Sequence, residues 1–378
     1  MQNHDHIPTR APMTTCHHHH HHHHRLHLLF RLALVSILTL GAARVIPYIL
    51  KYYFLPANND SLFEITKRSK YTDGFDGCDV FEGEWIWDDA TYPLYGEKDC
   101  PFLVKQTTCL KNGRPDSFYQ HWKWQPSGCS LPRFDGMKLM EMLRDKRLMF
   151  VGDSLQRSMF ESMVCLVQSA LPNDVKRSLR RIPPRKIFEV EEFNASIEYY
   201  WAPFIIESIS DDATDHTVFK RLVKLDSVAK HSKEWEGADI LVFESYVWWM
   251  YKPTIHATYG SWEWNPGTDG NCFNETHPIE KGSYWGTGSS LDIMGIVEDV
   301  LGQLKVQVTV LNITQLSEYR KDGHTSVYGE KKGKLLTKEQ RFDPKNFADC
   351  IHWCLPGVPD TWNEILYAFL LQDYRGQR

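Results

Sequence analysis

The stretch R-L-M-F-V-G-D-S-L-Q-R-S, residues 147–158, decides the fold class of this chain. It opens with a short apolar run typical of a buried strand, and the residues after Ser154 have the pattern of an amphipathic helix. A strand that ends in Gly-Asp-Ser and turns into a helix places the serine Oγ at the carboxyl edge of a sheet, where open α/β folds keep their active sites. The helix N-terminus adds free N–H groups that can hold an oxyanion. The alternative is that Asp153 or Ser154 serves only as a helix N-cap.

Other segments continue the α/β pattern. Predicted strands cover residues 147–151, 239–243 and 306–311, and predicted helices cover 137–144, 154–169, 291–304 and 361–371. Strands joined by helices indicate a parallel sheet with helices on both faces. Three strands are few for such a domain, because sheets usually contain about four to six.

Composition bounds the class of protein. The chain has 378 residues, of which 42% are hydrophobic, so it can build a substantial core. Its formal net charge is -5. Because no basic excess is present to neutralise phosphates, nucleic acid is excluded as an expected partner.

The N-terminal region predicts a membrane anchor. Residues 26–50 are mostly apolar, and Arg31 and Arg44 near the ends would have to reach the membrane interfaces. The positive-inside rule then places residues 1–25 in the cytosol. A cleaved signal peptide is the alternative, since Gly-Ala-Ala at 41–43 resembles a cleavage site. The tail contains a run of histidines that is either an expression tag or a natural low-complexity segment.

Composition divides the remainder into three parts. Residues 51–76 are polar, lack periodicity and are expected to form a stem. Residues 77–136 are dense in Cys, Trp, Gly and Pro, which predicts a loop-rich subdomain stapled by disulfides. Residues 137–378 form the predicted α/β catalytic domain.

Cysteine usage indicates an oxidising compartment. An even number of cysteines beyond the predicted anchor suggests four disulfides, formed in the lumen of the secretory pathway. These are Cys78, Cys100, Cys109, Cys129, Cys165, Cys272, Cys350 and Cys354. Zinc binding is the competing use, but no C-x2-C pair occurs, so no metal site is predicted. Sequons begin at Asn194, Asn274 and Asn312 and allow lumenal glycosylation.

Asp349-Cys-Ile-His352 near the C-terminus is a candidate base. In one helical turn, residues three apart share a face, so the Asp349 carboxylate can accept the His352 Nδ1–H and leave Nε2 directed at a serine. A neutral serine needs such a base to become nucleophilic. Taken alone, the pattern more often marks a surface aspartate beside a packed histidine. Together with the Gly-Asp-Ser motif it indicates a catalytic triad.

The motifs also resemble a known family. F-V-G-D-S-L-Q-R-S at 150–158, D-C-I-H-W-C-L-P-G-V-P-D-T-W-N at 349–363 and N-I-T-Q-L-S-E-Y-R-K-D-G-H-T-S-V-Y at 312–328 are similar to the plant trichome birefringence-like family. That family is a branch of the SGNH/GDSL superfamily and includes xylan O-acetyltransferases. The Cys-rich stretch is similar to its N-terminal domain, and the resemblance covers nearly everything from Gly77 to Leu371.

The resemblance implies roles for individual residues. Ser154 would be the acylated nucleophile, His352 its base and Asp349 the orienting carboxylate. The site around the oxyanion would include Gly152, Asp153, Arg157 and Asn194, and at Asn194 glycosylation competes with catalysis for one side chain. The implied disulfides are Cys78–Cys129, Cys100–Cys165, Cys109–Cys354 and Cys272–Cys350.

One departure from the family pattern lies near Gly260. There the chain runs directly into Ser261-Trp262, whereas the family inserts a helix and a strand. We therefore expect a spliced or internally deleted form that lacks one core strand, consistent with the low strand count.

The resemblance implies acetyl transfer to xylan, at O-2 or O-3 of xylosyl residues, by a single-pass type II Golgi membrane protein with a lumenal catalytic domain. No bound cofactor is expected. An acetyl donor is required as co-substrate and acetyl-CoA is one candidate, although no Gly-rich phosphate loop identifies it. An esterase with the same triad and a non-catalytic glycan-binding protein are the two alternatives.

Overall fold

The computed structural model describes residues 78–215, 222–250, 271–280, 282–286, 289–303, 308–331 and 333–376. The predicted tail, anchor and stem, and the discontinuity at Gly260, lie outside these residues. Within the described ranges, no helix has both the length and the apolar character needed to span a bilayer.

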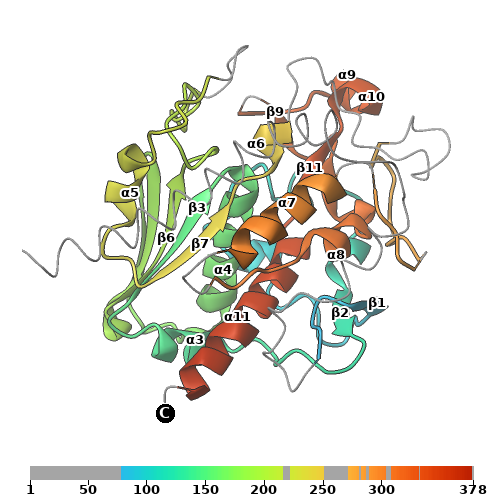
Figure 1. Cartoon of the computed structure of the whole chain (residues 1–378). Coiled ribbons are helices and arrows are strands. Elements are labelled where there is room, and N and C mark those ends of the chain that lie inside the picture. The colour runs from blue at the N-terminus through green and yellow to red at the C-terminus, as the bar shows by residue number, and fades with distance from the viewer. Residues whose placement is uncertain are drawn as a thin grey trace, which may run out of the picture.

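The elements follow one another in a mixed α/β order (Figure 1). The strands are β1 (Gly83–Trp87), β2 (Trp122–Pro126), β3 (Arg147–Gly152), β4 (Arg177–Ile182), β5 (Arg185–Val190), β6 (Ala195–Trp201), β7 (Ile240–Glu244), β8 (His324–Ser326), β9 (Glu330–Lys331), β10 (Lys334–Leu335) and β11 (Asp349–Trp353). The α-helices are α3 (Gly136–Met142), α4 (Ser154–Ala170), α5 (Ala229–Trp235), α6 (Val247–Met250), α7 (Leu291–Gly302), α8 (Thr314–Glu318), α9 (Lys338–Arg341), α10 (Pro344–Phe347) and α11 (Val358–Gly376). Short 3-10 turns are η1 (Glu97–Asp99), η2 (Phe118–Gln120), η3 (Glu191–Phe193) and η4 (Lys321–Gly323).

The central sheet has five strands in the order β4-β5-β6-β3-β7 and is mixed rather than parallel. β3 pairs in parallel with β6 and β7, whereas β5 is antiparallel to both β4 and β6. The expectation of a parallel sheet is therefore wrong for one half of it. The reason is loop length: Pro183-Pro184 alone connects β4 to β5, and such short connections cannot make a parallel crossover.

One predicted strand is absent from the described residues. Residues 308–311, the described part of the predicted strand 306–311, are not in a strand. A strand needs a ladder partner, and a cavity of about 1130 Å³ lies between this run and the sheet, lined by Ile240 and Val242 of β7 and by Val308 and Leu311. β7 is accordingly the last described strand on this side.

The remaining predicted elements are confirmed within a few residues. α3, β3, α4, β7, α7 and α11 all form where the hydrophobic pattern places them. The sequence pattern did not predict strands β4, β5 and β6 of the central sheet.

The side chains of β3 alternate between the two faces of the sheet, so they contribute to two separate layers of the core. Leu148 and Phe150 lie in the cluster built with α3, α4 and α11, whereas Met149 and Val151 pack on the opposite face with Trp235 of α5. Both faces of the sheet are therefore covered by helix, as Figure 1 shows. Each fully buried side chain of this size contributes roughly 1.5–3 kcal/mol.

The Cys-rich region is loop-rich, as expected, and contains a two-stranded antiparallel sheet of β1 and β2. Trp85 of β1 donates its Nε1–H to the Leu316 carbonyl of α8 at 2.8 Å, which ties the region to the C-terminal part of the chain. The structure forms the four disulfides that the resemblance implied. They are Cys78–Cys129, Cys100–Cys165, Cys109–Cys354 and Cys272–Cys350.

Candidate active site

Ser154 lies at the turn between β3 and α4, at the carboxyl edge of the sheet. Asp153 is the N-cap, and its Oδ1 accepts the Leu155 N–H at 2.8 Å. Gly152 is required by close approach, because a Cβ at this position would lie 2.2 Å from the Glu244 carbonyl oxygen of β7. Asp153 is therefore the helix N-cap, as the alternative interpretation proposed, and this role is compatible with a nucleophilic Ser154.

The C-terminal motif brings a base to this serine. His352 Nε2 lies 2.7 Å from Ser154 Oγ, and His352 Nδ1 lies 2.7 Å from Asp349 Oδ2. The three side chains therefore form a continuous hydrogen-bonded relay, although Ser154 and His352 are 198 residues apart in the sequence. This is the geometry that a nucleophile, its base and an orienting carboxylate require.

The backbone that carries Asp349 and His352 differs from the expected helical turn. Both residues lie in β11, which pairs with β8 with a register shift between Asp349 and Trp353. The Asp349 Oδ1 accepts the N–H of Ile351 at 3.0 Å and that of His352 at 3.1 Å. These bonds fold the strand back on its own carboxylate, so a spacing of three residues brings the side chains together without a helix.

Electrostatics keep the Asp349 carboxylate charged. Burial by itself would raise the pKa of Asp349, but the adjacent His352 ring and the two backbone N–H donors outweigh it and hold this pKa below its usual range. An ionised Asp349 accepts the Nδ1–H and leaves the unprotonated Nε2 of a neutral ring to take the serine proton.

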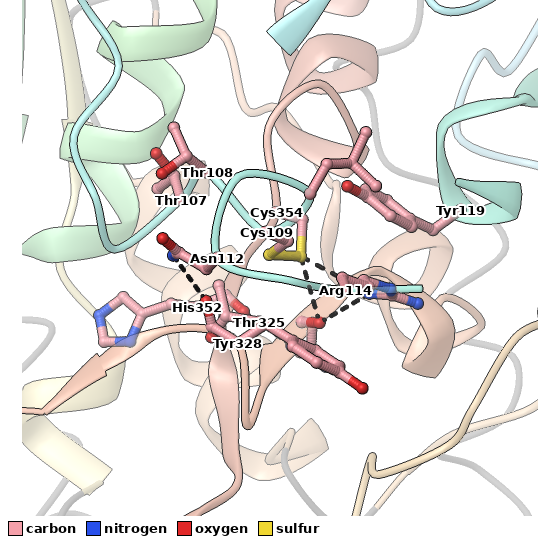
Figure 2. Close-up of a disulfide and its surroundings, with 12 residues drawn as sticks. Thr107, Thr108, Cys109, Asn112, Arg114, Tyr119, Thr325, Tyr328, His352 and Cys354 are labelled. Atoms are coloured by element: carbon pink, nitrogen blue, oxygen red, sulfur yellow. Dashed lines mark hydrogen bonds between the residues drawn. A yellow bond between two sulfur atoms is a disulfide. The ribbon is translucent and has the colours of Figure 1, made fainter. Parts of the chain in front are cut away.

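Two disulfides flank His352, and Figure 2 shows one of them, the bridge between Cys109 and Cys354. Cys350 is bonded to Cys272, and Cys354 is bonded to Cys109 of the Cys-rich subdomain. Each lies two residues from His352, Cys350 within β11 and Cys354 directly after its last residue. The base is thereby anchored on both sides to distant segments of the chain.

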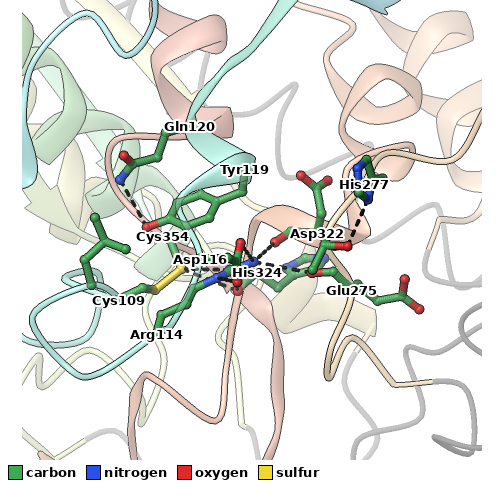
Figure 3. Close-up of polar contacts among 12 residues, drawn as sticks. Cys109, Arg114, Asp116, Tyr119, Gln120, Glu275, His277, Asp322, His324 and Cys354 are labelled. Atoms are coloured by element: carbon green, nitrogen blue, oxygen red, sulfur yellow. Dashed lines mark hydrogen bonds and ion pairs between the residues drawn. A yellow bond between two sulfur atoms is a disulfide. The ribbon is translucent and has the colours of Figure 1, made fainter. Parts of the chain in front are cut away.

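Arg114 is a second anchor from the Cys-rich subdomain (Figure 3). Its guanidinium donates to the carbonyl oxygens of Asp322 at 2.8 Å and His324 at 3.1 Å, and it pairs with Asp116 at 3.1 Å. The ring of Tyr119 lies 4.0 Å below the guanidinium. Because β8 begins at His324 and pairs with β11, this cation supports the strand that carries the base.

Arg157, one turn after Ser154, is held on two sides. Its Nη2 donates to Gln106 of the Cys-rich subdomain, and its Nε lies 3.7 Å from Glu161. Lys186 of β5 pairs with the same Glu161 at 2.7 Å. Arg157 therefore places a fixed positive charge close to the start of α4.

Asn194 is the clear correction among the predicted site residues. It precedes β6, and β6 runs parallel to β3 with Ser196 opposite Arg147, so Asn194 lies at the edge of the sheet opposite Ser154. Its exposed side chain donates to Asp145 Oδ1 at 2.9 Å. A role in the oxyanion hole is excluded by this position. Asn274 and Asn312, the other sequon residues, are also exposed.

Two polar residues near the site were not predicted, namely Gln106 and Glu244. Glu244 is the last residue of β7 and lies opposite Gly152. The rule that carboxyl ends of parallel strands share one edge could have found it, since the sequence continues the predicted strand 239–243 by one residue. No sequence pattern pointed to Gln106, because its partner Arg157 is distant in the sequence. Among the described residues, no group of three or more His, Cys, Asp or Glu could hold a metal ion.

The fold and the site together define an α/β protein with a serine–histidine–aspartate relay at the carboxyl edge of its sheet. Residues 131–263 and 254–369 match the PC-Esterase model, a GDSL/SGNH-like acyl-esterase family found in Pmr5 and Cas1p. Residues 76–130 match the PMR5 N-terminal domain. The chain belongs to the PC-esterase family.

Similar proteins come from plants. The chain is 57% identical to Protein trichome birefringence-like 31 of Arabidopsis thaliana over 403 residues, which cover 92% of this chain and 96% of that protein. It is 44% identical to Probable xylan O-acetyltransferase 10 of Oryza sativa subsp. japonica, over 78% of each chain. Xylan O-acetyltransferase 6 of the same species is 41% identical over 78% of this chain and 62% of that protein. The resemblance to the trichome birefringence-like family is thereby confirmed.

The comparisons also contain a discontinuity. The 403 aligned residues exceed the 378 residues of this chain, so the Arabidopsis relative has residues without a counterpart here. The PC-Esterase match comes as two stretches that overlap at 254–263, the region in which the sequence predicts a missing segment.

Proposed function

We propose that this chain is a polysaccharide O-acetyltransferase that moves an acetyl group through Ser154 to xylan, at O-2 or O-3 of xylosyl residues. The observation that carries the proposal is the 2.7 Å contact between Ser154 Oγ and His352 Nε2, backed by Asp349 on Nδ1. The family supplies acyl chemistry, and two of the relatives are named as xylan O-acetyltransferases.

In the first half-reaction, His352 takes the Ser154 proton as Oγ attacks the acetyl carbonyl carbon of the donor. The oxyanion of the tetrahedral intermediate lies at the start of α4, where first-turn N–H groups have no carbonyl partner inside the helix. Arg157 adds positive charge nearby. Collapse of the intermediate expels the donor's leaving group, which takes the proton from His352 and leaves acetyl-Ser154.

In the second half-reaction, a xylosyl hydroxyl replaces the donor. His352 accepts its proton as the sugar oxygen attacks the acetyl-Ser154 carbonyl. The second tetrahedral intermediate then expels the serine oxygen, which recovers its proton from His352. The relay thus returns to its starting state with one acetyl ester transferred.

The donor and compartment belong to the same proposal. Acetyl-CoA is the donor to be tested first. The four disulfides support an oxidising lumen as the place of action, and we propose a Golgi protein held by residues 26–50 as a type II anchor.

The test is the intact mass of the full-length chain after exposure to acetyl donor. One added acetyl group is expected on the native chain and none on Ser154→Ala. Ser169→Ala is the matched control, because Ser169 is an exposed serine on the same helix. Acetylation that persists in Ser154→Ala would refute the proposed intermediate.

The family description as an acyl-esterase favours one second function, hydrolysis of acetyl esters by the same triad. Deacetylated and acetylated xylan oligomers distinguish the two directions: mass gain of the former supports transfer, and mass loss of the latter supports hydrolysis. If glycan binding and cellular effect survive Ser154→Ala intact, the chain acts as a glycan-binding protein and both catalytic proposals fail.

A further inference from the structure

Two buried carboxyl groups meet directly beneath the candidate nucleophile. Gly152, at the end of β3, pairs in register with Glu244, at the end of β7. Asp153, the next residue, has no solvent exposure. The side chains of Asp153 and Glu244 are close enough to hydrogen-bond to each other. Two acidic groups thus meet at the strand ends, with Asp153 fully buried and Glu244 partly buried.

Each carboxyl group has one oxygen with a donor. Asp153 Oδ1 accepts the Leu155 N–H at 2.8 Å, and Glu244 Oε1 accepts the Tyr246 N–H at 3.2 Å. The other two oxygens, Asp153 Oδ2 and Glu244 Oε2, are shielded from solvent and have no donor among the groups that the structure describes. Two bare carboxylate oxygens in contact would repel each other in a low-dielectric interior. A single proton between them satisfies both.

We propose that Asp153 and Glu244 share one proton and that Glu244 is thereby a positioning residue for Ser154. The inference rests on the acyl-transfer site proposed above and adds to it a group that touches no substrate. Glu244 acts through Asp153, which caps α4 and so fixes the direction in which Ser154 leaves the turn.

The proton belongs mainly to Glu244. Burial raises the pKa of Glu244 well above its ordinary value, and the neighbouring Asp153 charge raises it further. Burial also raises the pKa of Asp153, but the Leu155 N–H and the nearby positive charge of Arg157 favour its ionised form. Glu244 therefore donates an O–H to Asp153 Oδ2, and Asp153 remains the anion at the helix N-terminus, where the helix dipole favours negative charge.

Loss of this proton would have a defined consequence. The folded chain holds it more tightly than the unfolded chain, so the stability that it contributes is complete below the unfolded pKa of Glu244 and declines as pH rises towards the folded value. Two adjacent buried anions would then separate the ends of β3 and β7. Ser154 follows Asp153 directly, so its distance to His352 would change with them.

The experiment uses a fluorophosphonate probe, which reacts with an activated serine without any acetyl donor. Labelling of the full-length chain is measured against pH for the native chain, Glu244→Gln, Glu244→Ala and Glu236→Gln. Gln keeps the shape, donates an N–H to Asp153 and cannot ionise. Glu236 is an exposed glutamate shortly before β7 and serves as the matched control.

We expect the native chain and Glu236→Gln to label at equal rates and to lose reactivity at alkaline pH. Glu244→Gln should label within about threefold of the native rate at neutral pH and should lack the alkaline loss. Glu244→Ala should label about 100-fold more slowly, because a misplaced nucleophile costs about that much. An identical alkaline loss in the native chain and Glu244→Gln would overturn the proposal, as would a native rate in Glu244→Ala.

A second measurement does not depend on serine reactivity. The melting temperature of Glu244→Gln should gain on that of the native chain as pH rises, because only the native chain must release a buried proton. A constant difference across the pH range would overturn the shared proton. Normal fluorophosphonate labelling without any acetyl-Ser154 would instead refute the proposed acetyl transfer and leave the carboxyl pair standing.

Discussion

Replacing Asp349 with asparagine isolates the orienting role of this carboxylate. Asp349 accepts the His352 Nδ1–H at 2.7 Å and two backbone N–H groups at 3.0 and 3.1 Å. Asparagine has nearly the same shape, and its oxygen can keep the backbone bonds. Its amide N–H₂ then faces Nδ1, so the ring presents Nδ1 as acceptor and carries its proton on Nε2. In this tautomer His352 cannot take the Ser154 proton.

The size of the effect follows from charge and distance. An imidazolium and a carboxylate about 4 Å apart attract by about 4 kcal/mol at an effective dielectric constant of 20. Losing this stabilisation in the transition state lowers the rate by about 10³-fold, and the wrong tautomer raises the loss towards 10⁴-fold. Since Asp349 touches no substrate in the proposed mechanism, KM should change little.

The assay is acetyl transfer from donor to xylo-oligosaccharide, followed by mass spectrometry over a substrate series to separate kcat from KM. Asp89→Asn is the control, because Asp89 is exposed on a surface turn of the Cys-rich subdomain. Thermal unfolding should show that Asp349→Asn stays folded. If the folded variant keeps kcat within about tenfold of the native value, Asp349 does not orient the base and the relay is wrong.

Three further predictions concern the support of the site and the pH dependence of the fold. Removing the Cys109–Cys354 bridge by a double Ala substitution should lower the free energy of unfolding by about 2–5 kcal/mol, as measured by denaturant unfolding. Kinetic measurements should show that acetyl transfer is reduced more than donor binding. Unchanged stability would show that the bridge does not restrain β11. Arg114→Lys should cost about 3 kcal/mol of unfolding free energy, because an ammonium cannot span the carbonyl oxygens that the guanidinium joins, and a melting temperature equal to that of the native chain would contradict this role. Burial raises the pKa of Glu364 to about 7, so the free energy of unfolding should fall by on the order of 3 kcal/mol at most as pH rises from about 4.5 to 7. The substitution Glu364→Gln should flatten this part of the stability profile. Parallel profiles for the native chain and the variant would refute this role of Glu364.

Most of the fold that positions the site could be predicted from the sequence. β3, α4, β7 and α11 have strong apolar runs or helical periodicity and bury their apolar faces on one core. β4 and β5 could not be found in this way, because arginines and lysines occupy much of their length and only one face packs. A half-exposed, charged hairpin gives neither a continuous apolar run nor a clear alternation.

The predicted parallel arrangement was wrong for the half of the sheet that contains β4 and β5, and the reason is the same. A parallel sheet was expected from strands joined by helices, but the hairpin at Pro183-Pro184 was not among the strands counted. The strand expected at 306–311 shows the opposite limit. Its described part, residues 308–311, has high strand propensity, but a cavity separates it from the edge of β7, so the two do not pair.

The residues of the candidate site also differ in whether the sequence alone could identify them. Ser154, His352 and Asp349 were found from short motifs, since their chemistry demands particular residue types at particular spacings. Asn194 was placed wrongly because its motif says nothing about which end of β6 it occupies. Glu244 was missed because its role depends on a neighbour in another strand, which only the register of β3 and β7 reveals.

The segment at 312–328 shows how one family motif supports the site without supplying a residue of the relay. Arg320 and Asp322 form an ion pair at 2.9 Å with almost no solvent exposure, and Arg320 also donates to the Tyr119 carbonyl at 2.7 Å. A buried pair of this kind adds little net stability, but breaking it is costly. Its position immediately before β8 therefore fixes the strand against which β11 and the base are aligned.

The discontinuity in the family match bears on the active site through β7. The cavity beside residues 308–311 is lined along β7, and it also reaches Leu155 and Gln156 of α4 and Cys350 and Ile351 of β11. β7 also ends in Glu244. If a missing strand leaves β7 with less support, the first group to shift is therefore the carboxyl that holds Asp153, and the relay of Ser154, His352 and Asp349 would keep its residues but lose its alignment. Restoring the relative's extra residues at this position should then raise the rate of fluorophosphonate labelling without altering any residue of the relay.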